Sequence, residues 1–266
     1  LVAEGPAEEL NLTVNTQPVM LTAAVALYRA WTATGGTAPS IAAGHSLGEY
    51  SALVAGGALT FADAVSLVRF RAQSMQDAVP AGSGAMAAIL GLEDEVVRTA
   101  CAEASAGNEI VEPANFNSPA QVVIAGKTAA VERAMEIAKG KGAKRAMLLP
   151  MSVPSHCGLM RPAAELMRNR LAETHVELSS VPVLHNADVK NARSGDAIRD
   201  ALVRQLYQPV RWVETIRALV TAGATHIVEC GPGKVLAGLN KRIAPETPMF
   251  TFGDEAAFNQ ALAALK

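Results

Sequence analysis

Apolar residues recur along the chain with two different spacings. A period of three to four residues, typical of an amphipathic helix, alternates with short continuous apolar runs typical of buried strands. The helical spacing covers residues 8–12, 19–31, 49–55, 61–75, 93–105, 128–139, 196–204, 235–242 and 254–265. The short runs predict strands at 41–44, 86–90, 110–113, 121–125, 144–149, 181–184, 226–229 and 249–252. Asn15 or Thr16, followed by Pro18, is expected to begin the second helix.

The middle of the chain has its own order of elements. After a joint at 80–84 that is rich in Gly, a strand, a helix, two strands, a helix and a strand follow one another. This is the ferredoxin-like β-α-β-β-α-β order. We therefore expect an inserted α+β subdomain at 82–151, flanked by residues 1–81 and 152–266, which form one discontinuous domain.

A short motif lies between the predicted strand at 41–44 and the helix that follows. Its letters, Gly-His-Ser-Leu-Gly, and its place are typical of a nucleophile elbow, a tight turn that strains the serine backbone and exposes its Oγ. Gly44 and Gly48 are expected to keep side chains out of the turn. Ser46 is the candidate nucleophile, and an oxyanion would lie near the Leu47 N–H. A Gly-x-Ser-x-Gly triple arises by chance in roughly one such chain in ten, so the prediction depends on its placement.

Composition narrows the class of protein. Half of the 266 residues are hydrophobic, 18% are charged and the formal net charge is −2. A globular core is expected, without disorder and without a nucleic-acid partner. No apolar run reaches the ~18 residues of a membrane span. The widely spaced cysteines fit free thiols in a reducing compartment, so we expect a cytoplasmic protein. They are Cys101, Cys157 and Cys230.

A serine nucleophile needs a general base, and His156 is the leading candidate. It stands in a Pro-Ser-His run that is expected to open a helix ending near 171, where its ring can face the serine. The other histidines are weaker candidates, one because it adjoins the serine and the rest because they lie in a helix tail or at strand ends. They are His45, His175, His185 and His226.

Two arginines, Arg69 and Arg71, lie on the mostly apolar helix at 61–75. Such residues usually reach solvent or form a salt bridge. A planar guanidinium can also bind a carboxylate with two parallel hydrogen bonds. A second motif, Gly-Pro-Gly-Lys at 231–234, precedes a helix but lacks the spacing of a nucleotide-binding P-loop.

Several separated segments resemble malonyl-CoA:acyl carrier protein transacylases, the acyltransferases that load malonyl units for fatty acid synthesis. In chain order, the segments are 44–54, 67–76, 153–157 and 202–212. The resemblance runs from Glu4 to Arg242. It implies an α/β fold, namely an α/β-hydrolase-like domain with a mostly parallel sheet that carries the ferredoxin-like insert.

The resemblance also implies roles for individual residues. Ser46 takes the malonyl group from malonyl-CoA with His156 as base, and Arg71 binds its free carboxylate. The phosphopantetheine thiol of acyl carrier protein then attacks the malonyl-serine ester. The backbone carbonyl of Gln205 orients His156 in place of an acid. Asp188 would be the orienting acid if the resemblance misled.

Further contacts follow from the same resemblance. The segment at 115–119 is expected to be a loop facing the substrate, so Asn115 or Asn117 would touch substrate; turn asparagines that cap backbone groups are the alternative. No metal and no cofactor are expected. The carrier protein of this family is acidic, so basic residues are expected to dock it, or else to be merely solvated. The candidates are Lys139, Lys141, Lys144, Lys234 and Lys241.

The sequence departs from the family pattern at its beginning. Family chains begin with a strand and a Gly-Gln-Gly-Ser-Gln loop that gives the second oxyanion donor, and neither is in this sequence. We expect a truncated or processed form, a monomer whose oxyanion hole holds the Leu47 N–H alone, at a cost of ~10²–10³ in rate. Two alternatives stay open. They are a serine esterase or thioesterase, which would not need Arg71, and a non-catalytic protein that binds the carrier.

Overall fold

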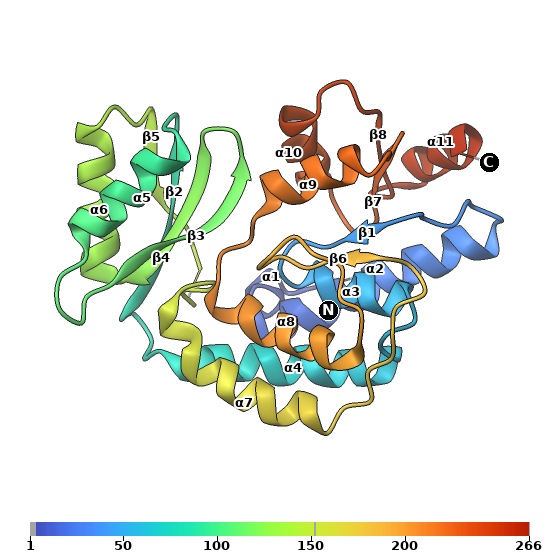
Figure 1. Cartoon of the computed structure of the whole chain (residues 1–266), viewed down its shortest axis with the longest axis horizontal. Helices are drawn as coiled ribbons and strands as arrows, with labels where there is room; N and C mark the ends of the chain where they lie inside the picture. The colour runs from blue at the N-terminus through green and yellow to red at the C-terminus, as the bar shows by residue number, and fades with distance from the viewer. Residues whose placement is uncertain (1–3, 152, 266) are drawn as a thin grey trace.

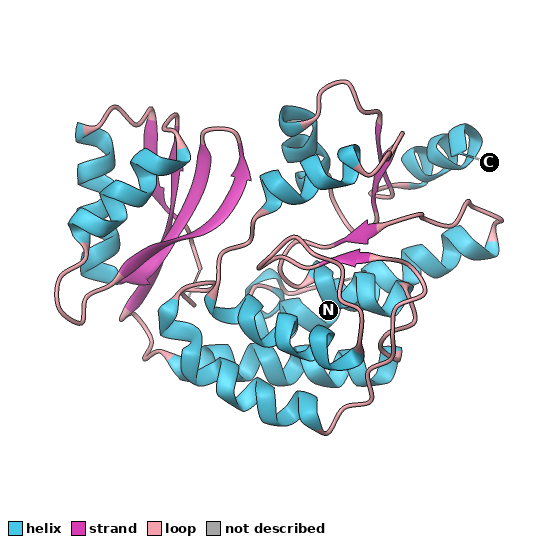
Figure 2. Ribbon diagram, in the orientation of Figure 1, coloured by secondary structure: helices cyan, strands magenta, loops and turns pink. Residues whose placement is uncertain are grey.

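The computed structural model describes residues 4–151 and 153–265. Figures 1 and 2 show two lobes, one made of a twisted sheet with two helices and the other mostly helical. No helix in these ranges is long and apolar enough to cross a membrane.

The smaller lobe has the ferredoxin-like order that the sequence predicts. Its four strands form one antiparallel sheet in the order β3-β4-β2-β5, and α5 and α6 pack on the sheet through a core that includes Ile89, Val97 and Val131. The elements are β2 (Gly84–Leu90), α5 (Asp94–Ala104), β3 (Val111–Ser118), β4 (Gln121–Lys127), α6 (Thr128–Gly140) and β5 (Arg145–Leu148). The prediction of this fold is confirmed.

Strand β3 is longer than the sequence suggests. The segment at 115–119, expected as a loop, continues β3 as far as Ser118. Along its free edge, the Phe116 N–H donates to the Val210 carbonyl (2.9 Å) and the Val210 N–H donates to the Ala114 carbonyl (2.9 Å). This pairing with a distant segment gives hydrogen-bond partners to the backbone of β3 and keeps its polar sequence extended. The local sequence pattern could not indicate the pairing.

The larger lobe combines helices with parallel strand pairs. In the described chain, β1 (Ala42–Ala43) pairs with β6 (Val183–Leu184), and β7 (Ile227–Glu229) pairs with β8 (Met249–Thr251), all in parallel. The helices are α1 (Ala7–Leu10), α2 (Thr13–Ala33), α3 (Gly48–Ala55), α4 (Phe61–Ala78), α7 (Arg161–Ala172), α8 (Gly195–Tyr207), α9 (Trp212–Thr221), α10 (Val235–Ile243) and α11 (Glu255–Leu265), with a 3₁₀ turn η1 (Gly158–Met160). Helix α9 was not predicted.

Helix α4 packs against α2 and against α7, in the lower part of the larger lobe as Figure 1 shows it. The apolar cluster between these helices, α3 and α8 is closed to solvent. It includes Leu21, Leu53, Leu67, Met167 and Leu202. Because α3 and α4 share this core, the elbow and the arginines of α4 are held in a fixed relation.

The predicted start of α2 was wrong. The helix begins at Thr13, and Pro18 lies inside it rather than in its first turn. Pro18 has no N–H for the Val14 carbonyl. Arg69 Nη1 donates to that carbonyl instead (2.9 Å), so the helix extends past the proline without an orphaned acceptor. Arg69 thus ties α4 to α2.

Candidate active site

The serine of the predicted elbow lies in a strained turn between β1 and α3. Ser46 has φ 52°, in the left-handed region that residues other than glycine rarely adopt. A Cβ on Gly44 would lie 1.9 Å from the carbonyl carbon of Gly48, so position 44 requires glycine. A Cβ on Gly48 would meet nothing within 4 Å. The expectation that both glycines relieve crowding was therefore wrong for Gly48.

The Asn186 side chain, which is buried, cross-links the elbow. Its Oδ1 accepts a hydrogen bond from the Ser46 N–H (2.7 Å), and its Nδ2 donates to the Gly44 carbonyl (2.6 Å). The Ser46 N–H is therefore occupied. The adjacent N–H of Leu47 meets no acceptor within the described chain, so it is the elbow donor left for an oxyanion.

His156 completes a serine–histidine pair. The Ser46 Oγ lies 2.7 Å from His156 Nε2, and His156 Nδ1 lies 2.7 Å from the backbone carbonyl of Gln205. A carbonyl only accepts, so Nδ1 carries the proton and Nε2 is left to accept from the serine hydroxyl. The bonding pattern is that of a general base oriented by a backbone group.

The backbone around His156 differs from the expectation. The 3₁₀ turn begins at Gly158 and α7 begins at Arg161, so His156 is not at a helix N-terminus. It is a loop residue with φ 61°, and its N–H donates to the Leu206 carbonyl (3.0 Å). The strained loop takes the orienting role that a helix end was expected to have.

The charge state of this pair is set by its surroundings. Burial, and next the positive charge of Arg71, lower the pKa of His156 to about 3, although its bond to the Gln205 carbonyl works in the opposite direction. The imidazole is therefore neutral at physiological pH. A neutral ring is the form that can take a proton from Ser46.

Arg71 reaches the same point from α4, with only 1% of its surface exposed. Its Nη1 donates to Gln17 Oε1 (2.7 Å), and its Nη2 donates to Gln205 Oε1 (3.0 Å) and to Ser46 Oγ (3.2 Å). Its Nε has no partner in the described chain. All three partners are neutral, so none of them forms an ion pair that would compete with a carboxylate next to the serine.

The predicted asparagines lie on β3, at different distances from the elbow. Asn117 Oδ1 accepts from Nε2 of His45 (2.8 Å), and His45 is the residue before Ser46. The His45 ring also meets Trp212 edge-on at 5.4 Å. Asn115 is buried where β3 bridges to Val210. Asn117 is therefore linked to the elbow, whereas Asn115 joins the two lobes.

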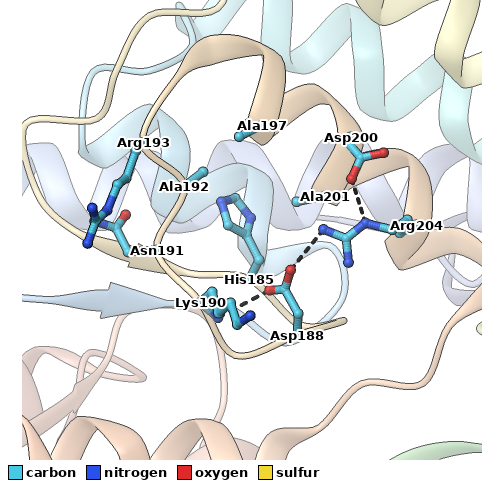
Figure 3. A pocket seen from close by; sticks show the side chains of 10 residues that line it. All are labelled: His185, Asp188, Lys190, Asn191, Ala192, Arg193, Ala197, Asp200, Ala201 and Arg204. Atoms are coloured by element: carbon cyan, nitrogen blue, oxygen red, sulfur yellow. Dashed lines mark hydrogen bonds and ion pairs between the residues drawn. The ribbon is translucent and has the colours of Figure 1, made fainter.

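Asp188, the alternative orienting acid, lies elsewhere. Its carboxylate accepts from Arg204 Nη2 (2.8 Å), and Arg204 also pairs with Asp200, on the wall of a cavity of about 200 Å³ (Figure 3). It does not contact His156, whose Nδ1 is taken by the Gln205 carbonyl. The alternative with Asp188 was wrong.

Sequence reasoning missed a buried acid beneath the elbow. Glu49 is wholly buried, and its Oε1 lies 2.7 Å from His185 Nδ1. Its Oε2 accepts from the Asn186 N–H (3.0 Å) and from Gln205 Nε2 (2.9 Å). Position 49 was assigned only to the start of a helix. Its place directly after the elbow was the one available signal that it lies near the site.

A strained serine on a strand-turn-helix, bonded to a neutral histidine, defines the class of enzymes that transfer acyl groups through a serine. Comparison with known proteins gives the family. The acyl transferase domain family matches residues 1–243. The malonyl CoA-acyl carrier protein transacylase of Escherichia coli K12 is 55% identical over 262 residues, 98% of this chain and 84% of that protein. The chain belongs to the malonyl CoA-acyl carrier protein transacylase family.

Solved structures agree with this assignment. An acyl-carrier-protein S-malonyltransferase from Burkholderia pseudomallei superposes with a TM-score of 0.96 at 59% identity, covering 98% of this chain and 85% of the other. A malonyl-transacylase solved in complex with a type II PKS acyl-carrier protein superposes with a TM-score of 0.96 at 51% identity, covering 98% and 84%. The expected fold, α/β with a ferredoxin-like insert, is that of the family.

Proposed function

We propose that this protein moves a malonyl group from malonyl-CoA to the phosphopantetheine thiol of acyl carrier protein, through a malonyl ester on Ser46. Family membership supports the reaction. One observation carries the choice of acyl group: a buried guanidinium, that of Arg71, lies 3.2 Å from the nucleophilic oxygen. A serine hydrolase needs no cation there.

The first half-reaction uses the serine–histidine pair. His156 Nε2 takes the hydroxyl proton as Ser46 Oγ attacks the thioester carbonyl, and the Leu47 N–H stabilises the oxyanion. The bond to sulfur then breaks, the thiol of CoA leaves with the proton, and the malonyl-serine ester remains. In the second half-reaction, His156 takes the proton of the carrier thiol as its sulfur attacks the ester. The bond to Ser46 Oγ then breaks, Oγ takes the proton back from His156, and the malonyl-carrier leaves.

Arg71 selects the diacid in this proposal. A malonyl ester carries a carboxylate two carbon atoms beyond the serine oxygen, within reach of a guanidinium beside that oxygen. The carboxylate replaces neutral acceptors of Arg71 and pairs with its charge. An acetyl ester offers no carboxylate to Arg71, so it lacks the direct ion pair that a malonyl ester forms there.

Surface lysines are the candidates for docking the carrier. Three of the candidate lysines already pair with acids, namely Lys139 with Glu136, Lys141 with Glu103 and Lys234 with Asp254. The solved complex of a related malonyl-transacylase with its carrier protein supports a direct encounter. Exposed ion pairs are weak, so each lysine can exchange its partner for an acidic carrier.

We also infer a monomeric, cytoplasmic protein that divides into the units 1–81 with 152–266, and 82–151. The free thiols support a reducing compartment. Separate apolar clusters, one confined to the ferredoxin-like lobe, support the division. Light scattering during gel filtration tests the monomer, and two chains per particle would contradict it.

A transfer assay tests the proposed function. The protein is mixed with malonyl-CoA and holo-acyl carrier protein, and the mass of the carrier is followed with time. We expect malonyl-carrier to form with wild type and not with Ser46→Ala. Release of free malonate without loading of the carrier would indicate a thioesterase. No turnover, with the carrier still bound, would indicate the non-catalytic alternative.

A further inference from the structure

Two buried charges of opposite sign lie beneath the elbow. Arg71 and Glu49 are 1% and 0% exposed. Among the described residues no carboxylate lies within ion-pair distance of Arg71, and the partner of Glu49 is His185, which is charged only if protonated. Buried charges are normally compensated, because an isolated one is costly.

The Gln205 side chain joins these two charges. Its Nε2 donates to Glu49 Oε2 (2.9 Å) and to the Ser46 carbonyl (2.9 Å). Its Oε1 accepts from Arg71 Nη2 (3.0 Å). Since two acceptors hold the amide nitrogen, the amide oxygen has to face the guanidinium. The orientation of Gln205 is thus set by Glu49.

We propose that Glu49 is a positioning residue for acyl transfer: through the Gln205 amide it holds the Arg71 guanidinium beside Ser46, and it supplies the counter-charge of Arg71 until an acyl carboxylate arrives. The replacement of Glu49 by an acyl carboxylate as the counter-charge rests on the proposed function. Burial lowers the pKa of Arg71, and the Glu49 carboxylate opposes that change, as a counter-charge does.

Glu49→Gln can remove the charge while keeping the hydrogen bonds. The amide oxygen accepts from the Asn186 N–H and from Gln205 Nε2, as the carboxylate does now. The new NH₂ donates to His185 Nδ1 once the ring proton moves to Nε2. The His185 ring lines the cavity of Figure 3, where Nε2 can carry that proton.

The matched control is Glu229→Gln. Glu229 is partly buried, and its carboxylate accepts from two backbone N–H groups, those of Leu236 and Ala237, at the start of α10. Losing its charge alters a helix end and leaves Arg71 untouched. It therefore reports the general effect of neutralising a hydrogen-bonded glutamate.

The experiment compares melting temperatures of wild type, Glu49→Gln and Glu229→Gln, each free, with saturating malonyl-CoA and with saturating acetyl-CoA. We expect free Glu49→Gln to melt lower, and malonyl-CoA to raise its melting temperature by several degrees more than it raises that of wild type or Glu229→Gln. The KM of Glu49→Gln for malonyl-CoA should also fall several-fold while kcat falls. The proposal would be overturned if malonyl-CoA raised the melting temperature of Glu49→Gln no more than that of wild type. It would also be overturned if acetyl-CoA raised the melting temperature of Glu49→Gln as much as malonyl-CoA does.

A double-mutant cycle decides the inference even if Glu49→Gln does not fold. Arg71→Met removes the cation, so combining it with Glu49→Gln leaves neither charge. The double variant should melt at a higher temperature than either single variant. Additive destabilisation would refute the coupling. Because this arm needs no substrate, a wild type that fails to react with malonyl-CoA would refute the proposed function alone.

Discussion

At the scale of single residues, His156 lies between a group that only accepts and one that can donate. The Gln205 carbonyl fixes the proton on Nδ1, and Nε2 faces the Ser46 hydroxyl. A carboxylate in place of the carbonyl would favour the imidazolium. The neutral carbonyl favours the imidazolium less than a carboxylate would, and both burial and the positive charge of Arg71 disfavour the imidazolium.

The low pKa of His156 predicts the pH dependence of acylation. The base has to be neutral, and its pKa is lowered to about 3, so kcat/KM for Ser46 acylation should stay level from about pH 8 to about pH 5. A histidine with the ordinary value would halve the rate near pH 6.5. Stopped-flow release of CoA measures kcat/KM for acylation, and circular dichroism at each pH is the control for unfolding.

The same change in pKa has a consequence for stability. The unfolded chain binds the proton of His156 at an ordinary pKa, and the folded chain binds it only near pH 3. Stability present above the unfolded pKa is therefore lost as pH falls from about 6.5 toward the folded value. Urea titrations at several pH values should show that the free energy of unfolding falls less with pH in His156→Gln than in wild type. An equal dependence on pH in the two proteins would contradict this prediction.

At the scale of elements, the elbow depends on one glycine much more than on the other. Gly44→Ala puts a Cβ 1.9 Å from the backbone of residue 48, so the turn has to open and Ser46 has to move. Gly48→Ala meets open space and lies at the start of α3, where alanine favours the helix.

We therefore predict that Gly44→Ala lowers the rate of Ser46 labelling by a serine-directed reagent at least ~100-fold, whereas Gly48→Ala changes it less than ~3-fold, since a 1 Å misplacement can cost that much. Thermal melts run in parallel separate global unfolding from local movement. Similar rates in the two variants would contradict the assigned role of Gly44.

Elements with a strong local signal could be predicted from the sequence. The amphipathic helix that became α4 and the alternating order of the ferredoxin-like lobe are cases in point, and the motif around Ser46 predicted the strained turn that the structure shows. The predictions that were wrong concern features that depend on residues distant in the sequence. The extension of β3 needs Val210, and Pro18 fits inside α2 because Arg69 serves the orphaned carbonyl.

The buried network could not be predicted for the same reason. Glu49 looked like an acid in the first turn of a helix, which is usually exposed. Its burial requires His185, Asn186 and Gln205, all more than a hundred residues away, to bring three donors to one carboxylate. Helix α9, by contrast, has a local signal of its own, because its buried apolar residues recur at helical spacing.

At the scale of the whole molecule, the ferredoxin-like lobe has a core of its own. The apolar cluster between its sheet and helices lies entirely between residues 85 and 146. The other face of the sheet packs on Cys157 and Leu159 of the larger lobe. We predict that residues 82–151 expressed alone unfold cooperatively in urea, at a lower midpoint than the full chain. A non-cooperative transition would contradict the proposed division.

The proposed reaction depends on two residues of the larger lobe: Ser46 carries a malonyl group, and Arg71 binds the carboxylate of that group. Intact mass after brief mixing with malonyl-CoA tests it most directly, using wild type, Ser46→Ala and Arg71→Ala, with acetyl-CoA in parallel. We predict a malonyl adduct on wild type, none on Ser46→Ala, little on Arg71→Ala and little acetyl adduct on wild type. Equal labelling of wild type by acetyl-CoA, or full malonyl labelling of Arg71→Ala, would contradict the account.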